Sequence, residues 1–160
     1  MTAMQARTAD TALPFIDEHA RVVPAPPEAA WTALAAVLAR ATGGPLAERY
    51  ARVIRCDPAA PDGTFPSGGS AIAGFRVARA DPPRELVLAG GHRFSRYALT
   101  FRLDALDGGR ATRVRAETRA VFPGIAGRAY RLAVIGTRGH ALAVRRLLGA
   151  VAERAERAPG

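Results

Sequence analysis

Residues 22–34, VVPAPPEAAWTAL, decide the fold that this chain of 160 residues is expected to adopt. A strand-like stretch runs into Pro24, Pro26 and Pro27, and a helix that carries Trp31 follows at once. Proline is favoured at the first helical position, because its fixed φ suits the helix and its missing N–H has no partner there. Glu28 adds a negative charge near the positive end of the helix dipole. The segment therefore predicts a strand, a sharp corner and an amphipathic helix.

The chain on either side of this corner predicts several strands and two long helices. Strands are expected at residues 15–24, 50–57, 71–79, 85–92, 97–104 and 111–122, and helices at 26–40 and 124–157. Short turns rich in glycine, proline and aspartate join the last four strands, and such short connections favour antiparallel hairpins. The pattern therefore indicates an α+β domain with an antiparallel sheet and a long C-terminal helix.

The last two predicted strands alternate in a way that gives the sheet one apolar face and one charged face. One face carries Tyr97, Leu99, Phe101 and Leu103 from one strand and Val114, Ala116, Thr118, Ala120 and Phe122 from the next. The long helix from Gly124 has an apolar stripe formed by Ile125, Ala129, Leu132, Gly136, His140, Ala143, Leu147 and Val151. Several of these residues are small, so a helix at normal distance from the sheet would leave space between them. Close packing of helix on sheet is the alternative interpretation.

The entry into the first helix, with the pattern A-P-P-E-x-x-W at residues 25–31, and the helix from Gly124 resemble the START-like or SRPBCC superfamily, which includes polyketide cyclase/dehydrase-like and Bet v 1-like proteins. The order of elements over about 145 residues agrees with this resemblance. It implies a helix-grip fold, in which a curved antiparallel sheet wraps around a long C-terminal helix and leaves a cavity. It also implies a hydrophobic or amphipathic ligand. The superfamily has no common catalytic signature, so the resemblance names no reaction.

The length and composition fit a single domain. Residues 14–158 are expected to form it, and residues 1–13 are expected to be a disordered tail without the apolar core of a signal peptide. No apolar run is long enough for a membrane span. Cys56 is the single cysteine and excludes an internal disulfide, so the cytoplasm is the expected location. A monomer and a homodimer both remain open.

The formal net charge of +9 arises from 23 arginines and no lysine, against 14 acidic residues. The second half of the chain holds 15 of these arginines, which predicts a basic patch there. No aromatic-rich strand or recognition motif accompanies the arginines, and we therefore do not expect nucleic acid as a partner. A basic surface module for an anionic partner is an interpretation that rests on charge alone.

His140 is the strongest candidate for chemistry, because it lies near the middle of the apolar stripe. It is expected to line the pocket as a general acid/base or as an anchor for a polar group of the ligand. The alternative is a structural histidine that bonds to a strand. His92 follows two glycines at the end of a strand and is expected at the pocket mouth with Tyr97, or in a turn. Trp31 and Tyr130 are interpreted as packing residues.

The ligand-binding residues expected from the faces of the sheet and helix are His140, Gly136, Ala143, His92, Tyr97, Leu99, Phe101, Ala116, Thr118 and Ala120. The three histidines and one cysteine lack the spacing of zinc ligands, and no glycine pair precedes a helix as in a phosphate loop, so no metal or cofactor site is predicted. Binding of a lipid-like or polyketide-like molecule is the favoured function. An aromatase/cyclase- or dehydratase-type enzyme is the alternative, with His140 as the tentative catalytic residue.

Overall fold

The computed structural model of the chain describes residues 12–158, so most of the predicted tail lies outside the described residues. Its strands form one antiparallel sheet in the order β1-β6-β5-β4-β3-β2. The strands are β1 (Phe15–Val23), β2 (Ala71–Ile72), β3 (Phe75–Asp81), β4 (Glu85–His92), β5 (Ser95–Leu106) and β6 (Ala111–Val121). The sheet is open, and its two edge strands are β1 and the short β2.

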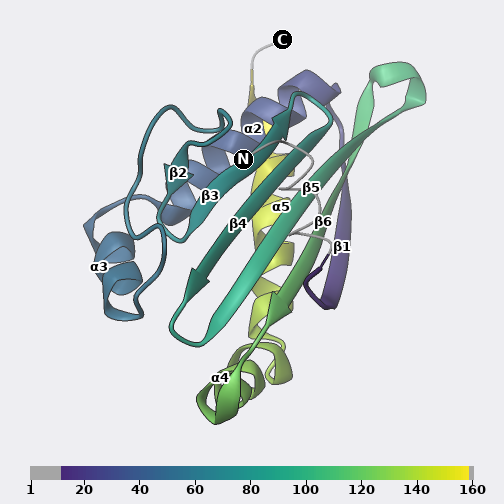
Figure 1. Ribbon diagram of the computed structural model, residues 1–160. Coiled ribbons are helices and arrows are strands. Elements are labelled where there is room, and N and C mark those ends of the chain that lie inside the picture. The colour runs from purple at the N-terminus through teal and green to yellow at the C-terminus, as the bar shows by residue number, and fades with distance from the viewer. Residues whose placement is uncertain (1–11, 159–160) are drawn as a thin grey trace.

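The helices cover one face of this sheet and one of its ends. They are α2 (Pro27–Thr42), α3 (Pro45–Val53), the short 3-10 turn η1 (Asp107–Gly109), α4 (Gly124–Arg131), the π-helical segment η2 (Leu132–Gly136) and α5 (Gly139–Arg157). Figure 1 shows α2 and α5 behind the sheet, α3 beside the β2–β3 end, and α4 at the lower end of β6. The sheet and its C-terminal helix have the α+β, helix-grip arrangement that was expected. Within residues 12–158, no helix is long and apolar enough to cross a bilayer.

The first helix forms as the proline-rich corner predicts. Helix α2 begins at Pro27, and Glu28 lies in its first turn. The helix ends at Thr42, before Gly43. Its buried side chains, among them Leu34 and Leu38, pack on α5 and the sheet. Helix α5 contributes to the same core the buried side chains of Val144, Leu148, Val151, Ala152 and Ala155. This part of the seam between helix and sheet is therefore a packed core.

Residues 50–57 were expected to form a strand, and that prediction is wrong. Half of them, residues 50–53, belong to α3, which begins at Pro45 and ends at Val53. Pro45 was interpreted as the end of the preceding helix, but it starts the next one, where proline is equally favoured. Glu48 and Arg52, one turn apart, form an ion pair that a helix allows and a strand does not. The residue types in this segment, among them Tyr50, Val53 and Ile54, are common in strands and were mistaken for one.

The strand expected at residues 71–79 is divided in two. Ile72 pairs with Phe75, so Ala73 and Gly74 form a two-residue hairpin turn between β2 and β3. Gly74 has a φ of +87°, a conformation that other residues rarely adopt. This turn brings the Gly74 carbonyl next to the inner side of β5.

The continuous helix expected from Gly124 to Arg157 is also wrong. The chain forms α4, one π-helical turn in η2, and then a break at Arg138, whose φ is +59°. Residues 132–139, LAVIGTRG, contain three β-branched residues and two glycines, all with low helix propensity. As a result, α4 departs from the line of α5 and lies at the end of the sheet, as Figure 1 shows.

Candidate functional site

A cavity of about 350 Å³ lies at the end of the sheet where β4 ends and β5 begins. One wall is α3, and the opposite wall is Tyr130 of α4 with the segment η2. The side chains of β5 and β6 form the back, and α5 contributes only its second residue, His140. The cavity therefore occupies one end of the helix–sheet seam, whereas the rest of that seam is filled.

The surface of the cavity is mostly apolar, and none of its lining residues is Asp, Glu or Arg. It is lined by Ala41, Thr42, Ala47, Tyr50, Ala51, Ile54, Cys56, Ala73, Gly74, Phe75, His92, Ser95, Tyr97, Ala98, Leu99, Thr118, Ala120, Phe122, Tyr130, Val134, Ile135 and His140. Pockets of this size and polarity are typical of sites for small organic molecules.

Aromatic rings form one side of the cavity. The rings of His92 and Tyr130 lie 4.8 Å apart in an edge-to-face arrangement, and Tyr130 stacks on Phe94 at 5.5 Å. His92 is also 5.6 Å from Tyr97, which meets Phe75 at 5.2 Å. Such ring contacts add stability beyond the area they bury. They link α4 to the β4–β5 hairpin and to β3, and so hold this wall in place.

His92 lies both in a turn and at the cavity, the two positions that the sequence left open for it. Its Nδ1 accepts a hydrogen bond of 3.2 Å from the Phe94 N–H, as a turn residue does. Its ring also lines the cavity beside Tyr97. Burial lowers the pKa of His92 below its ordinary value of 6.5, so the ring is neutral at pH 7 and gives the cavity no positive charge.

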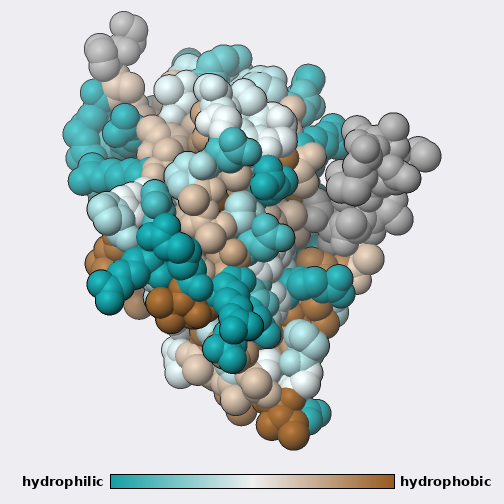
Figure 2. All heavy atoms as spheres, turned by 60° about the vertical axis from the view of Figure 1, so that its left-hand side comes forward, coloured by the Kyte–Doolittle hydropathy of each residue, from teal (hydrophilic) through white to brown (hydrophobic). Residues whose placement is uncertain are grey.

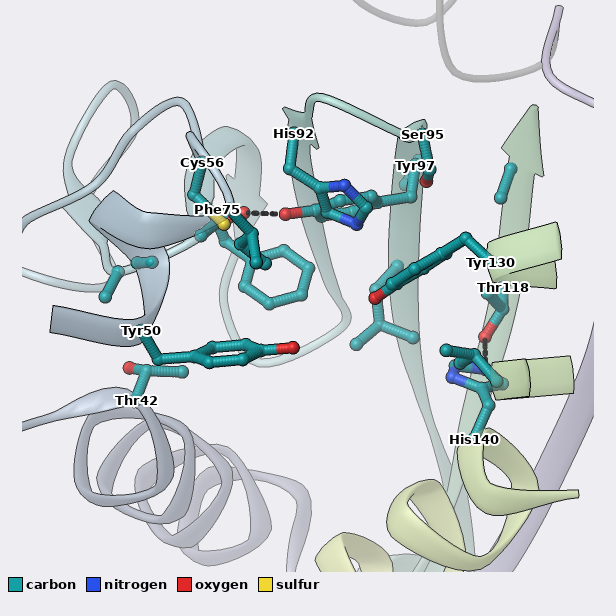
Figure 3. Close-up of a pocket in the computed structure, with 18 of the residues that line it drawn as sticks. Thr42, Tyr50, Cys56, Phe75, His92, Ser95, Tyr97, Thr118, Tyr130 and His140 are labelled. Carbon is teal, nitrogen blue, oxygen red and sulfur yellow. Dashed lines mark hydrogen bonds between the residues drawn. The ribbon is translucent and has the colours of Figure 1, made fainter. Parts of the chain in front are cut away.

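Two tyrosines face each other across the cavity. Figure 3 shows Tyr50 of α3 and Tyr130 of α4 reaching in from opposite sides, with both hydroxyl groups directed inward. Burial, followed by the nearby Tyr50 and Cys56, raises the pKa of Tyr130. Within residues 12–158, neither hydroxyl has a hydrogen-bond partner in the protein. Both are therefore available to a guest.

Cys56 lies beside the Tyr97 hydroxyl on the cavity wall (Figure 3). Burial raises the pKa of the Cys56 thiol, and the interaction with Tyr97 offsets this only in part. The thiol is thus protonated at neutral pH and is a weak nucleophile. Cys56 is therefore interpreted as a packing residue of the cavity wall.

His140 lies at the opposite end of the cavity from Cys56. Its Nε2 is 2.9 Å from the Thr118 hydroxyl of β6, so it bonds to a strand, as one of its two interpretations required. The same imidazole also lines the cavity, as the other interpretation required. The side chain is about one-fifth exposed, and Figure 3 shows its second ring nitrogen, Nδ1, on the cavity side.

The structure brings together six of the ten residues expected to bind ligand and separates the other four. His92, Tyr97, Leu99, Thr118, Ala120 and His140 line the cavity. The other four are outside its lining: Phe101 and Ala116 are fully buried in the core, and Gly136 and Ala143 are exposed. The positions expected of Gly136 and Ala143 are wrong because the stripe was drawn on a continuous helix, and the break at Arg138 rotates the two parts relative to each other.

Several cavity residues were missed from the sequence. Tyr130 was interpreted as a packing residue, since it lies off the stripe of an unbroken helix. Tyr50, Ala51 and Ile54 were placed on a strand, so their common helical face was not considered. The spacing of Ala47, Ala51 and Ile54, read as a helix after Pro45, was the signal available to find this wall.

The two helices on either side of the cavity, α3 and α4, and the start of η2 carry exposed apolar side chains. Leu46 of α3 is 81% exposed and Ile125 of α4 is 79% exposed, and Tyr50, Val53 and Leu132 are exposed as well. Figure 2 shows hydrophobic side chains at the surface near the lower end of the molecule, with hydrophilic ones above them. Residues 118–152, which run from the end of β6 through α4 and η2 into α5, contain six arginines and no acidic residue.

Within residues 12–158, no group of three or more histidine, cysteine, aspartate or glutamate side chains is placed to hold a metal ion. The polar side-chain groups that face the cavity are hydroxyls, a thiol and imidazoles. These groups suit hydrogen bonds to an organic guest.

Comparison with known proteins finds similarity in structure alone. No protein-family model matches the chain, and no curated protein matches it. Ara h 8.0201, a Bet v 1 protein, superposes with a TM-score of 0.57 at 11% identity, over 89% of this chain and 97% of that one.

Two bacterial proteins superpose with similar quality. A protein from Arthrobacter aurescens has a TM-score of 0.53 at 14% identity, over 85% of each chain. A protein from Nitrosospira multiformis has a TM-score of 0.52 at 14% identity, over 86% of this chain and 93% of that one. At these identities the likeness concerns the fold and carries no activity across. The chain therefore has the helix-grip fold that is found in Bet v 1 proteins.

Proposed function

We propose that this protein binds a neutral, largely apolar small molecule in the cavity between α3, α4 and the sheet. The observation that carries the proposal is the cavity itself, with a volume of about 350 Å³ and a lining without charged side chains. A charged guest would lose its hydration there without gaining an ion pair, which is costly. An apolar body with one or two polar groups fits the lining best.

The polar groups at the cavity surface indicate where such a molecule would be held. The hydroxyls of Tyr50 and Tyr130 lie near the middle, and His140 lies at one end (Figure 3). The flat rings of Tyr130, His92 and Tyr97 offer faces and edges for a planar guest. We infer an amphipathic guest with an aromatic or otherwise flat apolar body, such as a polyketide-like compound.

Native mass spectrometry of the purified full chain tests this proposal, since a guest retained from the cell adds its mass to the protein. A cavity-filling variant, Ala120→Phe, is expected to lose the guest, because Ala120 is buried and lines the cavity. Ala105→Phe is the matched control, since Ala105 is exposed and lies outside the lining. If the wild type carries no guest and also fails to take up added 1-naphthol, the proposal is overturned.

A second candidate is an enzyme of the aromatase/cyclase or dehydratase type that works in the same cavity. It is favoured by His140, whose imidazole meets both Thr118 and the cavity. A proton-transfer step needs such a group within reach of the guest. The test is to compare the guests that co-purify with the wild type and with His140→Gln. A difference of one water molecule in guest mass supports the dehydratase, and identical guests support binding alone.

A further inference from the structure

We propose that Asp17 is a positioning residue for His140: it holds the imidazole proton on Nε2, so that Nδ1 presents a hydrogen-bond acceptor to the cavity. The guest selected at this end is one that carries a hydroxyl or N–H donor. This inference rests on the proposed function, because it concerns the guest of the same cavity. It assigns a role to a residue outside the cavity lining.

An irregularity in β1 places Asp17 where it can act. Phe15 lies opposite Arg119 and Asp17 lies opposite Thr118, so two steps along β1 match one step along β6. This is a β-bulge, a feature that re-aims side chains and is frequent beside functional sites. It makes Asp17 the cross-strand neighbour of Thr118, the residue that His140 contacts.

The Asp17 carboxylate lies between two imidazoles. Its Oδ2 is 3.2 Å from Nε2 of His19, and its Oδ1 is 3.5 Å from Nε2 of His140. Oδ1 is buried and has no hydrogen-bond partner within residues 12–158. A buried acceptor without a donor is unfavourable, and an N–H on Nε2 of His140 is the group best placed to relieve this.

The donor and acceptor rules then fix the tautomer of His140. Nε2 faces two oxygen atoms, the Thr118 hydroxyl at 2.9 Å and the Asp17 carboxylate. A hydroxyl can donate or accept, but an ionised carboxylate only accepts. A lone pair on Nε2 would face the carboxylate and be repelled, so the proton belongs on Nε2. In the neutral ring, Nδ1 is then an acceptor on the cavity side.

The charges on β1 also have a structural explanation that accounts for only part of this arrangement. β1 is an end strand of the sheet, and inward-pointing charged residues protect such strands from pairing with other chains. This protective role explains why His19 and Arg21, and not apolar residues, lie on the inner face of β1. It does not require contact with a cavity residue, whereas Asp17 makes one with His140.

A built-in acceptor makes the cavity selective. A guest without a donor would leave Nδ1 buried against an apolar body, and sites of this kind discriminate strongly against analogues that lack the bonding group. The probes 1-naphthol and 1-methoxynaphthalene form a matched pair, since they share the ring system and differ in the donor. One hydrogen bond of about 1 kcal/mol corresponds to about a fivefold difference in Kd.

The experiment measures the Kd of both probes by calorimetry for the wild type, Asp17→Asn and Glu18→Gln. Glu18→Gln is the matched control, because it removes the neighbouring charge on β1, which pairs with Arg115 and not with His140. We expect the wild type and Glu18→Gln to prefer 1-naphthol about fivefold, and Asp17→Asn to lose most of this preference. An unchanged preference in Asp17→Asn overturns the inference.

Nitrogen-15 NMR of the His140 imidazole gives a readout that needs no guest and no variant. The wild-type ring is expected to show a protonated Nε2 and an unprotonated Nδ1, and the opposite pattern overturns the inference. The two proposals fail separately. Equal binding of both probes by the wild type removes the role of Asp17 and leaves the cavity's function intact. Binding of neither probe counts against the cavity's function, and the NMR result still decides the role of Asp17.

Discussion

The Tyr97 hydroxyl donates a hydrogen bond of 2.7 Å to the Gly74 carbonyl and so joins β5 to the turn between β2 and β3. Burial, together with the adjacent Cys56, raises the pKa of Tyr97, so the hydroxyl keeps its proton and remains a donor at any ordinary pH. This hydrogen bond holds the turn between β2 and β3 in the cavity wall, where the Gly74 carbonyl lies against Gly90.

Gly90→Ala is expected to destabilise the protein by about 2 kcal/mol, as overpacking does. A Cβ at position 90 would clash with the Gly74 carbonyl oxygen and lie 2.9 Å from the Tyr97 ring, so the turn would have to move. Gly91→Ala is the matched control, because its Cβ would have its nearest neighbour, the Ser95 carbonyl oxygen, at 3.4 Å. Urea unfolding of both variants measures the difference, and equal midpoints would contradict this account.

Leu148→Ala is expected to cost about 2–4 kcal/mol, because the side chain is 2% exposed in the core between α5 and the sheet. Leu142→Ala, on the same helix, is expected to change stability by less than about 0.5 kcal/mol, since Leu142 is half exposed. Thermal or urea unfolding tests the pair. A small effect of Leu148→Ala would mean that the packed part of the seam is looser than described.

His92 is expected to make the protein less stable in mild acid. Burial lowers the pKa of His92 in the folded state, so the unfolded chain binds the proton more readily. The free energy of unfolding therefore falls as the pH drops below the ordinary value of 6.5 and is unaffected by His92 well above it.

In His92→Asn this dependence is expected to weaken between about pH 7 and pH 5. Urea unfolding at several pH values provides the measurement, with the wild type as reference. Parallel curves for the two proteins would show that His92 does not titrate differently on folding.

Glu117, on the outer face of the sheet, is expected to stabilise the folded state. Burial would raise its pKa, but hydrogen bonds from Arg119 and Arg102 outweigh burial and lower the pKa below its ordinary value of 4.5. A carboxylate with a lowered pKa stabilises the folded state above pH 4.5, and this contribution is lost as the pH falls through the folded-state pKa.

Glu117→Gln is therefore expected to reduce stability at pH 7 by about 1 kcal/mol and to flatten its loss in acid. Glu153→Gln serves as the control, because its ion pair with Arg157 is largely exposed and such pairs contribute little. Acid titration of the unfolding midpoint distinguishes the two variants. Equal losses in both would place Glu117 among ordinary surface ion pairs.

The fold could be predicted because its signals are local and strong. Pro27 with Trp31 marked α2, and the alternation around Arg115 and Thr118 marked β6 within one residue of its observed end. Two helical segments could not be placed. In and just after α3, Tyr50, Val53 and Ile54 are residue types common in strands, and the ion pair between Glu48 and Arg52 becomes apparent only once a helix is assumed.

Apart from His140 on a helix, the candidate site was predicted where it depends on strands. Tyr97, Leu99, Thr118 and Ala120 follow from strict alternation, which survives small errors in strand length. Tyr130 and Gly136 depend on the direction of a helix, and the single residue Arg138 in a left-handed conformation changes that direction. The contact between Asp17 and His140 joins residues 123 positions apart through a bulge, and no local pattern announces it.

Residues 118–152 carry six arginines and no acidic residue, so the part of the chain that supplies Tyr130 and His140 to the cavity bears an excess of positive charge. A negatively charged molecule would approach this region faster at low ionic strength than at high ionic strength. Departure of an uncharged guest from the lining is insensitive to this charge. The rate at which a charged molecule approaches is thus expected to depend on salt, whereas the rate at which an uncharged guest leaves depends on its contacts with the lining.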